Sequence, residues 1–319
     1  MGQKQRFAFV QPLITKTKRG SFLMPENTYV FLTDSDSDLP YDVADARGIP
    51  VIKMPYMLNG EEYYDENGRE GEAAQKAFFD KMRAGAVPVT ACLSKHNYLE
   101  FFEPYLQMGK DILFVAFSSQ MSATLQYAAE AREELLAQYP GRRIEMVDTL
   151  SISAPMTLLV VAAHDLYLQG KSLDEVRQWV LDNRMRAHAV LTVDSLTYLK
   201  RGGRLSPTSA FFGTMLDLKP IIVMGKSGKM DAADKVQGRK KAIRALVERT
   251  ADLIEDPAGQ TLIIMHADAP EDAQRLAEML RARIPELKNI RIVMVGPVIG
   301  AHCGPGTLAS AFMGKPRQV

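Results

Sequence analysis

The chain has 319 residues, a hydrophobic fraction of 46% and 39 Lys and Arg against 38 Asp and Glu, which gives a formal net charge of +1. This length is enough for two domains with separate cores, and the near-neutral charge argues against a DNA or RNA partner, because nucleic-acid binding relies on a positive field. Apolar runs stay below the ~18 residues that a membrane-spanning helix needs, and the two cysteines, Cys92 and Cys303, fit a reducing compartment, so we expect a cytoplasmic protein.

The first half of the chain alternates strand-like and helix-like segments. Residues 1–27 are interpreted as an N-terminal extension that lacks a signal-peptide core. A buried strand is predicted at 29–35, then a helix that ends at Gly48, a second strand at 49–58 and a hairpin turn at Asn59-Gly60. The alternation continues beyond this turn and predicts a parallel sheet with helices on both faces.

A second unit is predicted from about residue 189, where strands come first and helices follow. The run at 220–230 predicts a strand, a Gly-rich turn and a strand, and 242–256 predicts a helix. We therefore predict a two-domain α/β protein. Residues 28–188 form a parallel-sheet α/β/α domain in this interpretation, and 189–319 form a mixed-sheet α/β domain.

Five short segments carry most of the functional signal. They are TDSDSDLP at 33–40, TACLS at 90–94, SSQMSATLQ at 118–126, YLKRGGRLS at 198–206 and IGAHCGPGT at 299–307. In order and spacing they resemble sequence blocks of the DegV family, across nearly everything from Thr28 to Gly314.

The resemblance implies a lipid-binding protein with two α/β domains and one buried long-chain fatty acid. It further implies that the chain is not itself an enzyme. A DAK-type fatty acid kinase is the implied partner, which converts the acid to acyl phosphate for phospholipid synthesis. We expect no cofactor besides the bound acid, and at most transient contact with membranes.

A fatty acid carboxylate at the mouth of an apolar tunnel loses water and therefore needs several hydrogen-bond donors. On the positions that match the family's motifs, Thr90, Ser122 and His302 are the expected contacts with this carboxylate. Other donors of the same segments are expected around them: Ser94, Ser118, Ser119, Thr124, Arg201 and Arg204.

These residues also have interpretations that need no ligand. Isolated Ser and Thr in loops are mostly turn or cap residues, and a loop histidine is more often solvated. His302 stands out because glycines flank it in what we predict to be a Gly-rich turn. The cations at 198–206 fit either a solvated turn or a contact of Arg201 or Arg204 with the lipid head group or the kinase.

The alternating Asp34, Asp36 and Asp38 resemble the start of a calcium loop. However, Leu39 occupies the position that needs Gly, and Asp45 replaces the bidentate Glu. We therefore expect no metal and interpret these aspartates as helix caps and as residues at the carboxyl end of the first strand.

Cys92 and Cys303 lie in two motifs that should converge on the anion site. They are either small buried fillers or neighbours at the pocket mouth that a bound acid would shield. Methionines, among them Met121 and Met215, offer flexible apolar surface for the acyl tail.

A rival function is a serine hydrolase for lipids or esters. It would use Ser122 and His302 with Asp34 or Asp148, although no G-x-S-x-G elbow occurs in the sequence. A nucleotide-binding enzyme is a weaker rival, because neither a G-x-x-x-x-G-K-[ST] loop nor a G-x-G-x-x-G loop follows the first strand.

Overall fold

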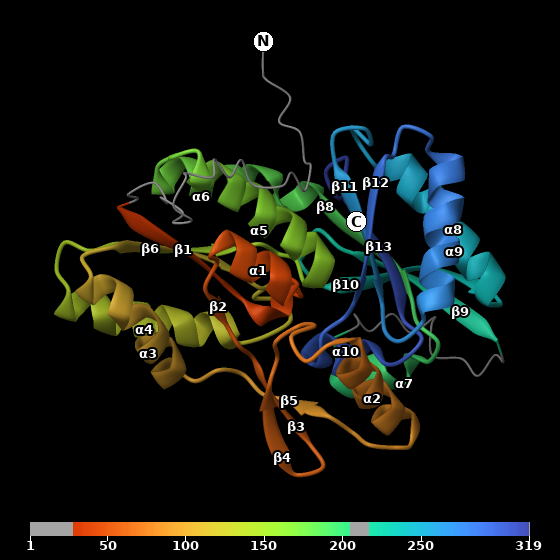
Figure 1. Ribbon diagram of the computed structural model, residues 1–319, viewed down its shortest axis with the longest axis horizontal. Helices are drawn as coiled ribbons and strands as arrows, with labels where there is room; N and C mark the ends of the chain where they lie inside the picture. Colours follow the sequence, from red (N-terminus) through yellow and green to blue (C-terminus); the bar gives the residue numbers. More distant parts are fainter. Residues whose placement is uncertain (1–27, 205–216, 319) are drawn as a thin grey trace, which may run out of the picture.

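The computed structural model describes residues 28–204 and 217–318. Two larger β-sheets carry helices on their faces, and a small third sheet projects beside them (Figure 1). The extension 1–27, the last two positions of the 198–206 segment and Met215 lie outside the described residues. Within the described part, no helix combines the length and the apolar character that crossing a bilayer requires.

The first sheet has four parallel strands in the order β2-β1-β6-β7. Their bounds are β1 Tyr29–Asp34, β2 Val51–Ile52, β6 Asp111–Ala116 and β7 Ile144–Asp148. Helices α3 and α4 cover one face, and α5 and α6 cover the other (Figure 1). The helices of this half are α1 Tyr41–Arg47, α3 Lys95–Gln107, α4 Thr124–Gln138, α5 Ser153–Leu168 and α6 Leu173–Asn183. The predicted α/β/α layering is confirmed, and the continuous apolar run of β6 is buried because both faces are covered.

The third sheet is antiparallel, in the order β4-β3-β5, and was not predicted. Its strands are β3 Pro55–Leu58, β4 Glu61–Tyr64 and β5 Val89–Thr90, and α2 Glu72–Arg83 lies between β4 and β5 in the chain. The predicted hairpin at Asn59-Gly60 is confirmed, with φ of 54° and 85°, because this turn needs left-handed backbone at both positions. The single strand predicted at 49–58 is wrong. It divides into β2 and β3, which belong to different sheets, because Pro55 has no N–H with which to continue a ladder.

The six-stranded sheet is mixed, as predicted, in the order β10-β9-β8-β13-β11-β12. Its strands are β8 Ala187–Thr192, β9 Leu218–Met224, β10 Met230–Gln237, β11 Thr261–His266, β12 Asn289–Met294 and β13 Leu308–Met313. β11 and β12 run parallel and the other pairs run antiparallel. β8 starts at Ala187, just before the expected domain boundary at 189, which stays a prediction.

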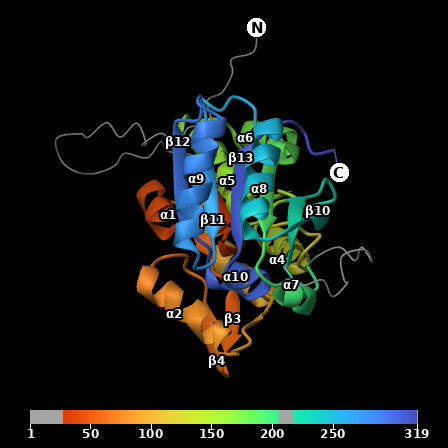
Figure 2. The same cartoon turned by 90° about the vertical axis from the view of Figure 1, so that its right-hand side faces the viewer.

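The two faces of this sheet pack against different partners. Val190, Leu308 and Phe312 belong to the core that includes α8 Arg239–Leu253 and α9 Pro270–Arg283. These two helices lie together on the outer face (Figure 2). The alternate residues of the same strands, such as Leu191 and Ala309, belong to the core shared with the first sheet, because successive strand residues point to opposite faces.

Arg317, which follows β13, forms hydrogen bonds to three separate segments of the chain. The Arg317 guanidinium is buried, with 6% of the residue exposed, and it donates to backbone carbonyls and to the Ser151 hydroxyl. It donates to the carbonyls of Leu150, Gly225 and Arg184 at 2.9, 2.8 and 2.6 Å. One side chain thus joins the loop after β7, the turn after β9 and the approach to β8.

Candidate functional site

A cavity lies between the carboxyl edge of the four-stranded sheet and the inner face of the six-stranded sheet. Its empty space is about 1050 Å³, including open space at the mouth. Apolar side chains from both sheets and from the neighbouring helices form most of the wall, among them Phe117, Pro155, Leu191, Leu199, Met265 and Ile299.

Thr90, Ser122 and His302 all line this cavity. The Thr90 hydroxyl lies 2.8 Å from Nε2 of His302, although 212 residues separate them in the chain. The Ser122 and Thr124 hydroxyls are 2.6 Å apart, and the Thr124 N–H donates to Ser122 Oγ at 3.2 Å. The structure therefore places hydroxyls from two separate segments and one imidazole on the wall of one largely apolar space.

His302 lies in the last turn of α10, Pro297–Cys303, and not in a Gly-rich turn as predicted. Pro297 starts this helix at a position where its missing N–H costs nothing. Gly202 packs against the imidazole so closely that a Cβ there would lie 2.4 Å from His302 Nδ1. Burial, and next the charge of Arg204, lower the pKa of His302 to about 4. His302 is therefore neutral at pH 7 and has one N–H to donate.

Arg204 is the one permanently charged cation among the described residues that line the cavity. Its Nε donates to the Met121 carbonyl at 3.3 Å, and Nη1 donates to the Gly202 carbonyl. These bonds hold the guanidinium beside the polar end of the cavity and leave further donors for an anion.

Four of the expected surrounding residues do not line the cavity. Ser94 caps the N-terminus of α3, and the buried Ser118 hydroxyl donates to the Gly228 carbonyl at 2.7 Å. Ser119 donates to Asp148 at 2.6 Å. The Arg201 guanidinium lies 5.9 Å from the centre of the Tyr198 ring. Of the surrounding set, Thr124 and Arg204 remain at the site.

The aspartates of the first motif are not helix caps, which corrects the sequence interpretation. α1 begins at Tyr41 after Pro40, without a side-chain cap, and Ser35–Ser37 form a short 3-10 turn. Asp38 is buried and accepts from the Gly296 N–H at 2.7 Å and from the Ser153 hydroxyl at 2.5 Å. The motif thus links α1 to the starts of α10 and α5, which both border the cavity.

Four buried carboxyl groups gather here: Asp34, Asp36, Asp38 and Asp65. Burial raises the pKa of Asp34 and of Asp38 to about 7. Burial, and next the neighbouring carboxylates, raise the pKa of Asp36 and of Asp65 well above the usual range. Within the described part, no group of three or more His, Cys, Asp or Glu is arranged to hold a metal ion.

Both cysteines line the cavity but differ in environment. Cys303 is buried, and burial raises its pKa to about 12. Cys92 is exposed, with its sulfur 3.5 Å from Ser122 Oγ. Partial burial alone would raise the pKa of Cys92, but hydrogen bonds from Ser122 and Thr124 and the charge of Arg204 outweigh it, so this pKa is lowered.

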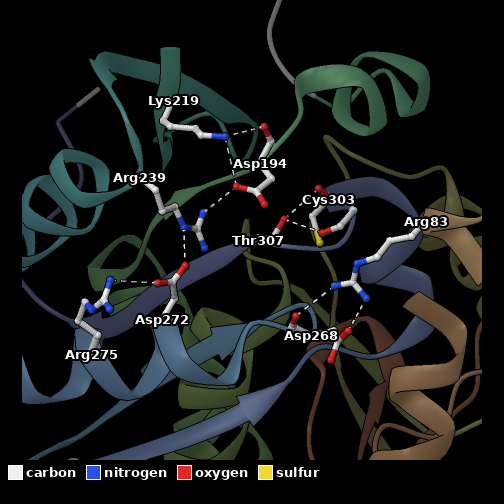
Figure 3. A network of polar contacts seen from close by, with 10 residues as sticks. Arg83, Asp194, Lys219, Arg239, Asp268, Asp272, Arg275, Cys303 and Thr307 are labelled. Atoms are coloured by element: carbon white, nitrogen blue, oxygen red, sulfur yellow. Dashed lines mark hydrogen bonds and ion pairs between the residues drawn. The ribbon is translucent and has the colours of Figure 1, made fainter. Parts of the chain in front are cut away.

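The loop between α10 and β13 is held by polar contacts (Figure 3). The Thr307 hydroxyl donates to the carbonyls of Cys303 and Gly304, each at 2.9 Å. Beside it, Asp194 pairs with Lys219 at 3.3 Å and with Arg239 at 3.5 Å. These contacts fix the loop that joins His302 to the cavity-lining strand β13.

The arrangement that a serine hydrolase needs is not assembled among the described residues. Ser122 Oγ bonds with the Thr124 hydroxyl and lies 3.5 Å from the Cys92 sulfur, whereas His302 pairs with Thr90. Asp34 accepts from the Phe117 N–H at 2.9 Å, and Asp148 accepts from Ser119, so neither aspartate orients the imidazole.

The sequence analysis did not identify the part of the cavity that the six-stranded sheet lines. Ala189, Ala309 and Ala311 line it from the middle of the six-stranded sheet. Alanine is depleted in strands relative to β-branched residues, so three alanines in two central strands were an available signal of unfilled space.

Comparisons with known proteins agree on one family. A model described as the uncharacterised DegV family matches residues 29–315. A DegV domain-containing protein of Clostridium perfringens is 39% identical over 91% of this chain and 99% of that protein. A Thermus thermophilus DegV family protein, solved in a study of fatty acid binding, is 28% identical with a TM-score of 0.77, over 89% of this chain and 99% of that one. A DegV lipid binding protein of Thermotoga maritima is 26% identical with a TM-score of 0.75, over 91% and 99%.

Proposed function

This chain belongs to the DegV family, and we propose that it binds one long-chain fatty acid in the cavity, with the carboxylate held by Thr90, Ser122 and His302. The observation that carries the proposal is the combination of a long apolar wall with a cluster of neutral donors on the same cavity. The fatty acid binding of the Thermus thermophilus relative supports it.

The hydrocarbon tail supplies most of the affinity. Each CH₂ removed from water contributes about 0.8 kcal/mol, so a tail of many CH₂ groups outweighs a single polar contact even after the losses of association. The wall formed by Phe117, Leu191, Met265 and similar residues suits such a tail.

The polar residues Thr90, Ser122, His302 and Arg204 orient the carboxylate and add less to the affinity than the tail does. The hydrogen-bonded pair of Thr90 and His302 can donate one hydrogen bond to it, the Ser122 hydroxyl can donate another, and Arg204 supplies a compensating charge. Because Cys92 beside Ser122 is exposed, the carboxylate end faces the accessible side of the cavity in this arrangement.

We test the ligand first by native mass spectrometry of protein purified without added lipid, followed by calorimetric titration with hexadecanoic acid. The expected result is a retained mass that matches a long-chain fatty acid. Thr90→Val and Ser122→Ala should each weaken binding by about 1.5–3 kcal/mol, the worth of a hydrogen bond to a charged group. Ser119→Ala, which removes a hydroxyl outside the cavity, is the matched control and should leave binding unchanged. A protein that neither retains nor binds fatty acid refutes the proposal.

We propose further that the bound acid is presented to a DAK-type fatty acid kinase, which forms acyl phosphate from ATP. An accessible carboxylate end supports such a transfer. The test mixes the loaded protein with such a kinase and ATP and traps acyl phosphate as a hydroxamate. Product that depends on both proteins is expected, and product formed equally well from free fatty acid would contradict the presentation role.

A further inference from the structure

The inner face of the six-stranded sheet lines the cavity in two rows of opposed residues. Leu191 of β8, Ala309 of β13 and Met265 of β11 lie side by side in register. Ala189 of β8 lies opposite Ala311 of β13 in the second row. All five residues border the cavity.

The cavity ends beyond the second row. The next residues on the same face are Ala187 and Met313, which oppose each other and are 0% and 2% exposed. Neither is part of the cavity wall, and nor is Ile263, which lies beside Ala311. Since antiparallel strands rise ≈ 3.4 Å per residue, successive rows are about 6.8 Å apart.

The direction of β13 shows which end is closed. Thr307, directly before this strand, lines the cavity and bonds to the carbonyl of Cys303, the neighbour of His302. Ala309 and then Ala311 follow along the strand, away from His302. The Ala189–Ala311 pair therefore lies at the end opposite the carboxylate site.

Helix α5 closes the space over these rows. It packs against β8 and β13, and its first residues Ala154 and Pro155 line the cavity. Because side chains in a packed interior interdigitate closely, two opposed alanines beneath this helix leave room that larger strand residues would fill.

We infer that the Ala189–Ala311 pair is the length stop of the cavity and selects long acyl chains by leaving space for the terminal carbons of the tail. This inference rests on the proposed fatty acid binding. Larger side chains at either position would occupy the space of those carbons and leave the carboxylate site untouched, so they would change the preferred chain length and not the head-group chemistry.

The test compares wild type, Ala311→Leu and Ala189→Val by calorimetric titration with dodecanoic, tetradecanoic, hexadecanoic and octadecanoic acids. Each excluded CH₂ should weaken binding about fourfold. Ala311→Leu, which adds about three carbons, should weaken octadecanoic acid by roughly tenfold to a hundredfold while dodecanoic acid keeps its affinity. Ala189→Val should cause a smaller shift in the same direction.

Ala233→Leu is the matched control, because Ala233 is exposed on β10 of the same sheet and should not affect any chain length. Ala309→Leu, one row nearer the carboxylate, should move the cut-off to still shorter chains. Thermal unfolding without ligand verifies that each variant is folded. If Ala311→Leu does not fold, Ala189→Val provides the test of chain length.

The outcomes distinguish a failure of the proposed fatty acid binding from a failure of the proposed role of Ala189 and Ala311. Wild-type protein that binds none of the acids refutes the proposed function. Wild-type binding with variants that keep octadecanoic acid, or that lose all four acids equally while folded, overturns the length stop alone.

Discussion

Raising the pH from 6.5 to 8 should destabilise this protein. Four aspartates beside the cavity are buried, between 1% and 6% exposed, and burial raises the pKa of each. In the unfolded chain an aspartate has a pKa of about 3.9. The folded protein therefore keeps protons on carboxyl groups that the unfolded chain has already ionised.

The sign follows from the direction of these shifts. A carboxyl whose pKa is higher in the folded state contributes stability below its unfolded pKa, and that contribution is lost as the pH rises through the folded pKa. The pKa values of Asp34 and Asp38 reach about 7, so their stabilising contribution is still being lost between pH 6.5 and 8. The pKa values of Asp36 and Asp65 are raised in the same direction, so both carboxyl groups add to this loss of stability.

Buried histidines oppose this trend at lower pH. Burial lowers the pKa of His164 to about 3 and of His302 to about 4, and it also lowers those of His188 and His266. The stability that these neutral histidines contribute is lost as the pH falls below about 6.5, the pKa of a histidine in the unfolded chain. The histidines and the aspartates act in opposite directions below pH 6.5, so we expect the clear decline of stability only above that value.

The magnitude is about 1.4 kcal/mol per pH unit for each carboxyl that is still protonated in the folded state. With pKa values of about 7, Asp34 and Asp38 together give a loss of roughly 1.5 kcal/mol between pH 6.5 and 8, a noticeable part of a typical stability of about 5–15 kcal/mol. Asp65→Asn mimics the protonated form and keeps an oxygen for the Val298 N–H, which now lies 3.4 Å from Asp65. Because burial raises the pKa of Asp65, this variant should lose less stability than wild type over the same pH range.

The assay is urea unfolding at half-unit steps from pH 6.5 to 8, with the midpoint and slope of each transition recorded. Asp252→Asn, at an exposed position of α8, is the control and should run parallel to wild type. A wild-type stability that is constant or rises over this range would refute the reasoning, as would an Asp65→Asn slope equal to that of wild type.

Three further outcomes are expected. Thiol labelling should be faster at the exposed Cys92, whose pKa is lowered, than at Cys303, and saturating fatty acid should slow it; an unchanged rate at both positions would contradict a shared pocket mouth. Arg204→Met should weaken binding of hexadecanoic acid by about 2 kcal/mol more than binding of hexadecanol, measured by calorimetry, because only the acid brings a charge; equal losses would exclude a charge contact. Arg317→Met should lower the free energy of unfolding in urea by about 2–4 kcal/mol, because it leaves carbonyls of three separate segments without their donor; an unchanged midpoint would show that water replaces it.

The layered architecture could be predicted because its signals are local. Alternating strand and helix patterns and the Asn59-Gly60 turn each depend on neighbouring residues. The convergence of Thr90 and His302 is different, since 212 residues separate them. Only the resemblance of five segments to one family indicated that they meet.

The errors arose where tertiary contacts override local preference. Asp34, Asp36 and Asp38 have the composition of a helix cap, yet they are buried because the starts of α5 and α10 supply donors for Asp38 from elsewhere in the chain. His302 was expected in a turn because glycines surround it, but Pro297 starts a short helix there. Such partners are invisible to a pattern read over a few residues.

The position of β13 has a consequence for biosynthesis. This strand lies between β8 and β11 in the middle of its sheet, yet it is made after both of them. During translation the four-stranded sheet has all its strands by Asp148, whereas the larger sheet must wait for Met313 before its two halves can join. A nascent chain shorter than that has neither His302 in place nor a floor under α5, so the cavity proposed for the fatty acid is complete only once Met313 has joined the sheet.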